Sequence, residues 1–143
     1  MPLSAVAAAF AIFGSASTAH AAITWDTSIL SMRTSIDSDG ADAKAEIWER
    51  GYSYWENEAN FDANGEELRL LDDRQDGQLA IAQVWVYNKS GTLVDTDTFS
   101  TGSVDRFNMG TPDGSGDIPE GYEVRINICV GNITCAGTAK GRA

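Results

Sequence analysis

The chain has 143 residues, of which 21 are Asp or Glu, 10 are Lys or Arg and one is His, so its formal net charge is −11. This length suffices for one domain with a hydrophobic core but not for two. The negative charge argues against nucleic acids and anionic membranes as partners, because both select basic surfaces. It favours cationic partners or bound cations instead.

The first residues have the pattern of an export signal. Residues 3–14 form an uncharged apolar run, and Ala19-His20-Ala21 matches the small-residue pattern at which signal peptidase cuts. The run is shorter than the roughly 20 apolar residues that a membrane span needs. We therefore predict a signal peptide over residues 1–21 and a secreted domain over residues 22–143. The only histidine would leave with the signal.

Residues 23–36 are rich in β-branched side chains and predict a strand, which ends before a turn at Gly40. The same region offers a calcium site as an alternative. Oxygen-bearing side chains follow the spacing of a calcium loop, so Asp37, Asp39 and Glu46 are candidate ligands. A plain Asp-Gly turn explains these residues without an ion. Apart from calcium, we predict no cofactor.

Residues 43–57 predict a second extended run, interrupted by Gly51. Read as one strand, the run places Trp48, Tyr52 and Tyr54 on its more highly charged face, which should face water. Exposed aromatic rings in a row offer stacking surfaces for sugars, or anchors for a protein partner. The alternative is a bulge or turn at Gly51, which would reverse the alternation and send Tyr52 and Tyr54 into the core.

Four later segments also predict strands. Their bounds are 68–71, 78–88, 92–100 and 122–130, and turn residues such as Asn64-Gly65 and Pro119-Glu120-Gly121 separate them. Residues 78–88 are apolar on both faces, which indicates a central strand buried from both sides with Trp85 and Tyr87 in the core. Residues 122–130 alternate strictly and are typical of a strand with one buried face.

The two cysteines of the chain are Cys129 and Cys135. An even number of cysteines in an exported chain predicts a disulfide, here one that joins the last hairpin. The closed loop is short, so the expected stabilisation is only about 2 kcal/mol on the chain-entropy estimate.

About eight short strands separated by turns predict an all-β fold, a single-domain antiparallel β-sandwich. The residues Pro119-Glu120-Gly121-Tyr122, followed by Val124, resemble the turn into a late strand of fibronectin-type-III and immunoglobulin-like domains. That resemblance implies a sandwich of the same kind. A jelly roll or a small barrel is the alternative.

Loss of the histidine removes Ser-His-Asp and Cys-His catalysis, so we expect no catalytic residues. The preferred hypothesis is a secreted, non-catalytic binding module whose partner is carbohydrate or a secreted or cell-surface protein. One alternative is an acidic inhibitor or effector that docks on a cationic partner, since residues 37–76 hold 13 acids and 4 bases. A small hydrolase that uses two carboxyl groups is the other. The Ala- and Gly-rich composition is typical of a bacterial protein.

Overall fold

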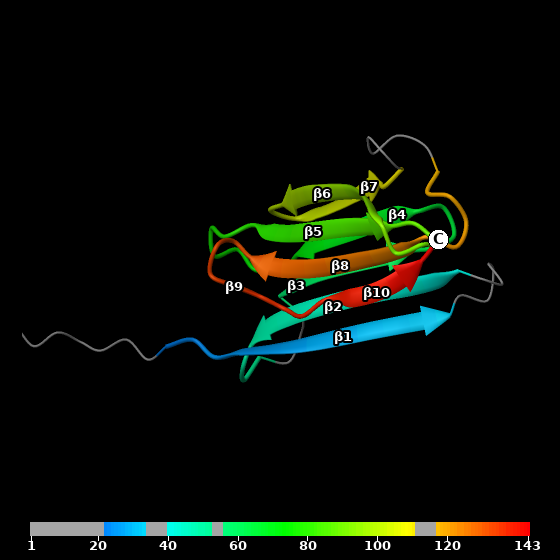
Figure 1. Ribbon diagram of the computed structural model, residues 1–143. Coiled ribbons are helices and arrows are strands. Elements are labelled where there is room, and N and C mark those ends of the chain that lie inside the picture. Colours follow the sequence, from blue (N-terminus) through cyan, green and yellow to red (C-terminus); the bar gives the residue numbers. More distant parts are fainter. Residues whose placement is uncertain (1–21, 34–39, 53–55, 111–116) are drawn as a thin grey trace, which may run out of the picture.

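The computed structural model describes residues 22–33, 40–52, 56–110 and 117–143 (Figure 1). Among these residues there are strands, turns and loops, and no helix. The strands are β1 (Trp25–Arg33), β2 (Ala41–Glu49), β3 (Asn57–Asp62), β4 (Glu67–Asp72), β5 (Ala80–Tyr87), β6 (Leu93–Thr101), β7 (Val104–Asn108), β8 (Glu123–Val130), β9 (Thr134–Cys135) and β10 (Ala139–Arg142).

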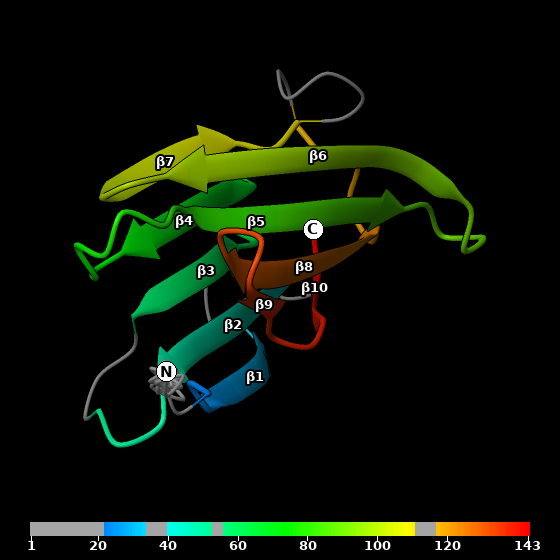
Figure 2. The same cartoon turned by 90° about the vertical axis from the view of Figure 1, so that its left-hand side faces the viewer.

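All ten strands belong to one antiparallel sheet, which curls until it is nearly closed into a barrel (Figure 2). The order along the sheet is β6-β5-β8-β10-β2-β3-β4-β7, while β1 pairs with β2 and β9 pairs with β8. The curl brings β4 opposite β5 and β6, and it brings β8 opposite β2 and β3.

The curled sheet is weakly joined at two places. Strand β10 meets β2 through a single residue pair, Arg142 with Ala41. The two end strands of the sheet, β6 and β7, contact each other, and their described residues share no hydrogen-bonded ladder. Phe99 of β6 and Phe107 of β7 fill this second seam, with ring centroids 4.7 Å apart.

The core lies inside the curl, because alternate residues of each strand point to the same face. The largest fully buried side chains are Ile47, Phe61, Leu68, Leu70, Val84, Val86, Met109, Ile118, Val124, Ile126 and Ile128. Alanines occupy several other inner positions of β2 and β5, where small side chains let the opposing walls approach.

The structure confirms the predicted all-β fold and its antiparallel pairing. The chain also turns where predicted: Gly65 and Gly121 both have positive φ, and Tyr122 N–H donates to the Pro119 carbonyl at 3.1 Å. The two separate sheets of a sandwich are not confirmed, because ladder pairing connects all ten strands. About eight strands were expected, and the additional ones include the short β9 and β10.

The prediction for residues 78–88 is wrong in one respect. β5 is a central strand, hydrogen-bonded to β6 and β8, but only one of its faces is buried. Trp85 and Tyr87 lie on the outer face and are half-buried, so they are not core residues. An apolar sequence does not show whether a second layer of the protein covers the outer face of the strand. None of the described strands covers the outer face of β5.

The predicted disulfide is confirmed. Cys129 of β8 and Cys135 of β9 are directly opposite residues of the ladder, and their sulfur atoms are bonded. The bridge therefore joins the two strands of the final hairpin, and among the described residues no cysteine is free.

Candidate functional site

The outer face of β2 carries the first of the predicted aromatic residues. Ala43, Ala45 and Ile47 are buried in the core, whereas Lys44 and Trp48 lie on the opposite face. This is the alternation that the sequence predicts. Trp48 is half-buried at the end of the strand.

The strand ends at Glu49, and the chain turns at Arg50 and Gly51. Gly51 has a φ of 100°, a conformation that glycine adopts without steric cost, and Tyr52 N–H donates to the Glu49 carbonyl at 3.2 Å. The break at Gly51 therefore exists, but it does not send Tyr52 into the core, because Tyr52 remains 55% exposed. Tyr54 lies outside the described residues.

Arg74, from the loop after β4, supports the exposed Tyr52 ring. Its guanidinium carbon lies 5.9 Å from the centroid of the Tyr52 ring. Three carboxylates hold this guanidinium in place: Glu49 at 2.9 Å, Glu56 at 3.0 Å and Asp76 at 3.4 Å. Burial alone would lower the pKa of Arg74, but its pairing with Glu56 and Glu49 raises that pKa overall.

We call residues 48–52 together with Arg74 the aromatic turn. The sequence pattern predicts its aromatic residues as a binding site but does not indicate Arg74, which lies 22 positions beyond Tyr52. The only sequence signal for Arg74 is that it is a single base among Asp72, Asp73 and Asp76. The antiparallel ladder of β3 and β4 brings it back beside Glu56 and the end of β2.

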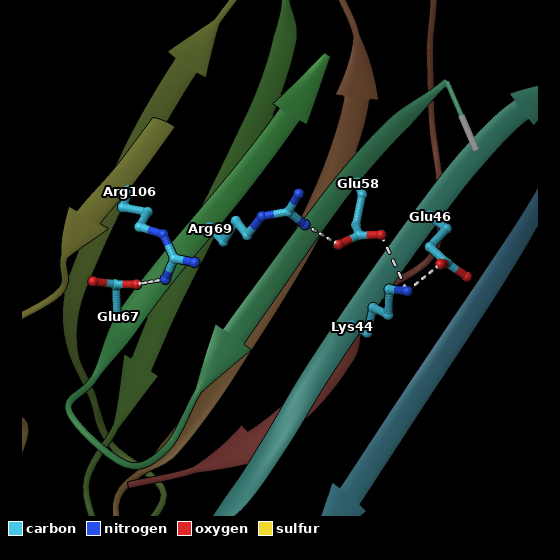
Figure 3. A network of polar contacts seen from close by, with 6 residues as sticks. All are labelled: Lys44, Glu46, Glu58, Glu67, Arg69 and Arg106. Atoms are coloured by element: carbon cyan, nitrogen blue, oxygen red, sulfur yellow. Dashed lines mark hydrogen bonds and ion pairs between the residues drawn. The ribbon is translucent and has the colours of Figure 1, made fainter. Parts of the chain in front are cut away.

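A row of charged side chains crosses the outer face of β2, β3, β4 and β7 (Figure 3). The register places Glu46 directly opposite Glu58. Lys44 Nζ lies 2.5 Å from Glu46 and 3.1 Å from Glu58, and Arg69 donates to Glu58 at 2.9 Å. Burial alone would lower the pKa of Lys44, and its hydrogen bonds with the two carboxylates raise it. Glu67 and Arg106 form a further ion pair at the end of the row.

Glu46 and Glu58 face each other across the ladder of β2 and β3, so they are the first pair to consider for a carboxylate-based hydrolase. Glu46 is 3% exposed and Glu58 is 7% exposed, and both are held by Lys44. A glycosidase pair must reach a substrate placed between its carboxyl groups. In this structure the Lys44 ammonium group pairs with both carboxylates.

The predicted calcium ligands are only partly placed. Asp37 and Asp39 lie outside the described residues, and Glu46 is ion-paired with Lys44, which competes with a metal for the same oxygens. Within the described ranges, no group of three or more His, Cys, Asp or Glu residues is arranged to hold a metal ion.

Comparison of the chain with protein-family models, with curated proteins and with solved structures finds no match. The described part of the chain also has no helix long and apolar enough to cross a membrane.

Proposed function

We propose that this chain is a secreted, non-catalytic binding module that holds carbohydrate at the aromatic turn. The observation that carries the proposal is the exposed Tyr52 ring, which rests on a guanidinium anchored by three carboxylates. An exposed aromatic ring fixed in this way loses little conformational freedom on binding, and a preorganised surface binds more tightly than a mobile one.

The chemistry of the aromatic turn suits a sugar. The apolar face of a pyranose ring stacks on an aromatic ring, and its hydroxyl groups need hydrogen-bond donors and acceptors at the rim. The Glu49 and Asp76 side chains are each about one quarter exposed and supply acceptors beside the tyrosine. Trp48, half-buried at the end of β2, is the second aromatic residue of the aromatic turn.

Secretion is part of this proposal. A disulfide between Cys129 and Cys135 is consistent with an oxidising compartment outside the cytoplasm. It agrees with the export signal predicted for residues 1–21, which lie outside the described residues.

The proposal is tested by measuring the binding of the protein to a panel of cell-wall and storage polysaccharides. Affinity electrophoresis or calorimetry gives the Kd for each polysaccharide. For a glycan that binds the wild type, Tyr52→Ala should raise Kd about fivefold, since an aromatic contact of this kind contributes about 1 kcal/mol beyond burial. Tyr52→Phe keeps the ring and should bind nearly as well as the wild type.

Ile133→Ala is the matched control, because Ile133 is 56% exposed and lies on a different part of the surface. Its affinity should equal that of the wild type. Absence of binding to every glycan, or equal weakening by Tyr52→Ala and Ile133→Ala, would rule out the aromatic turn as a sugar site.

The acidic inhibitor or effector is a second candidate, and the ion-pair pattern supports it. All four bases of residues 37–76, which are Lys44, Arg50, Arg69 and Arg74, are paired with acids of the same chain. Because 13 acids and 4 bases occur here, a surplus of 9 negative charges is left for a cationic partner. Binding to such a partner should weaken strongly in high salt, whereas stacking of a neutral sugar should not.

A further inference from the structure

The basic side chains are unevenly distributed over this acidic molecule. Five of them lie on or beside β2, β4 and β7 and are all in ion pairs: Lys44, Arg50, Arg69, Arg74 and Arg106. Four others gather on or beside the outer face of β8 and β10: Lys89, Arg125, Lys140 and Arg142. Of these four, only Arg125 has an ion pair with a described residue, which is Glu123.

Strand register and turn geometry build a small recess from this group. One row across the sheet contains Tyr87 of β5, Glu123 of β8 and Arg142 of β10, and Arg125 lies two residues along β8. Lys89 enters from the turn between β5 and β6. These residues, with Gly121, line a recess of about 200 Å³, which we call the basic recess.

Contacts with neighbouring residues hold two of the three cations of the recess, Arg125 and Lys89, in position. The guanidinium of Arg125 lies over the Tyr87 ring, 4.1 Å from its centroid, and its Nε donates to Glu123 at 2.5 Å. The Lys89 side chain lies against Gly121, where a Cβ would come within 2.6 Å of Lys89 Cε. The absence of a side chain at position 121 therefore lets the lysine reach over the turn.

Stability does not explain this arrangement. Arg125 and Lys140 are directly opposite residues on β8 and β10, and like charges at such positions are destabilising. The chain has 21 acids, yet Glu123 is the one acid among the described residues that line the recess. Three of the residues that line the recess are cations and one is an anion. A lining with equal numbers of positive and negative charges would stabilise the folded state more.

We propose that the basic recess binds a small oxyanion ligand through a carboxylate or phosphate group. Guanidinium groups match the two oxygens of such a group, and an ammonium adds a compact point charge beside them. In this site Arg142 and Lys89 contact the anion. The guanidinium of Arg125, which Tyr87 and Glu123 hold in a fixed position, determines the orientation of the bound anion. The polar lining and the volume fit a hydrophilic molecule of about the size of one acidic sugar.

Calorimetric titrations of the full chain with glucuronate, inorganic phosphate and neutral glucose test this inference. We expect saturable binding of glucuronate, of phosphate or of both, and none of glucose; which anion binds identifies the carboxylate or the phosphate as the ligand chemistry. Lys89→Ala and Arg142→Gln should each raise Kd about tenfold to hundredfold, the range for a lost hydrogen bond to a charged group. Affinity should also fall as sodium chloride is added.

Arg106→Ala is the matched control, because it removes one positive charge from an exposed side chain on β7, away from the recess. It should leave the affinity unchanged. Lys89 lies in an exposed turn, so its variant tests the site even if Arg142→Gln disturbs the strand that carries it. Binding of neither anion, equal binding of glucose, or equal weakening by Arg106→Ala would overturn the proposal.

The outcome is independent of the proposed sugar site. Tyr52→Ala should bind the anion as the wild type does, and Lys89→Ala should keep the affinity of the aromatic turn for its glycan. If binding at one of the two surfaces is not found, the variants of the other surface still test the proposal made for it.

Discussion

Lys44 neutralises two carboxylates that the strand register places directly opposite each other. Glu46 and Glu58 are both nearly buried, although they lie on the outer face of the sheet. Two buried like charges at opposite positions would destabilise the pairing of β2 and β3. The ammonium group between them makes the arrangement stable, and Arg69 shares the charge of Glu58.

Substitution of Lys44 by Met should therefore be costly. We expect the free energy of unfolding to fall by about 3 kcal/mol, the scale for breaking a buried ion pair by removal of one partner. Urea titration with a fixed m-value measures the change. Adding Glu46→Gln to the variant should recover part of the loss, because it removes one of the two uncompensated charges. Lys140→Met, at an exposed position, is the control, and an equal loss there would contradict this account.

Asp72 is a buried carboxylate at the end of β4, and it is 9% exposed. It accepts a hydrogen bond from Arg74 N–H at 3.2 Å. Burial raises its pKa above the ordinary value of 3.8, and the neighbouring charges of Asp76 and Asp73 act in the same direction. The raised pKa means that the folded state takes up the proton more readily than the unfolded state does, so the ionised form costs stability at neutral pH.

Asp72→Asn should consequently raise Tm at neutral pH, since the amide keeps an acceptor oxygen without the charge. The gain over the wild type should shrink as the pH falls through the raised pKa of Asp72 and vanish below 3.8. Thermal unfolding of both proteins across this pH range measures the difference. Asp73→Asn, at an exposed neighbour, should show a smaller effect. A lower Tm for Asp72→Asn at neutral pH would show that the hydrogen bonds outweigh the burial cost.

At the scale of elements, β10 determines how the two halves of the sheet meet. It shares a ladder with β8 and reaches β2 only at the pair Arg142 and Ala41. Gly141 lies at this crossing, where a Cβ would come within 2.6 Å of the Ala41 carbonyl oxygen and 2.7 Å of Phe61 Cδ1. The contact between β10 and β2 therefore depends on the missing side chain.

Gly141→Ala should separate β10 from β2 or displace Phe61. We expect a loss of about 1–3 kcal/mol in the free energy of unfolding, as for other overpacked sites. Chemical denaturation gives the magnitude, and hydrogen exchange at β10 and β2 should locate it. Thr138→Ala, on the exposed segment before β10, should leave stability nearly unchanged. Equal stability of Gly141→Ala and the wild type would mean that the crossing relaxes freely.

At the scale of the whole molecule, the balance of charge opposes folding. The formal net charge is −11, and self-repulsion of such a charge destabilises a compact state. The ion pairs of Glu46, Glu56 and Glu58 are partly buried and are screened less than the exposed acids. Added salt therefore removes more repulsion than attraction.

Tm should rise when sodium chloride is increased from a low concentration to about 0.15 M, where charges more than about 8 Å apart are largely screened. Differential scanning calorimetry measures the shift, and sucrose at matched osmolality controls for solute effects. A fall in Tm with salt would show that the exposed ion pairs, such as Asp26 with Arg50, stabilise the fold more than the net charge destabilises it.

Local features of the sequence determined much of this molecule. The alternation of residues 122–130 predicted which side chains of β8 are buried, because neighbouring residues of a strand point to opposite faces. Gly65 and Gly121 marked turns, because their backbone conformations favour glycine. The even number of cysteines predicted a disulfide, and the position of Cys129 and Cys135 near the end of the chain placed it in the last hairpin. The alternation and the turns act over a few adjacent residues, and the two cysteines lie only six positions apart.

Only the tertiary structure decided which distant residues meet. The outward position of Trp85 and Tyr87 follows from the curl of the sheet, which encloses one face of β5 and leaves the other open. The contact of Arg74 with Tyr52 depends on the register of β2, β3 and β4. Lys89, Arg125 and Arg142 line one recess because β5 and β10 end, and β8 begins, on the same side of the sheet. The register of the strands and the curvature of the sheet depend on the packing of the whole core, so a local sequence pattern does not predict them.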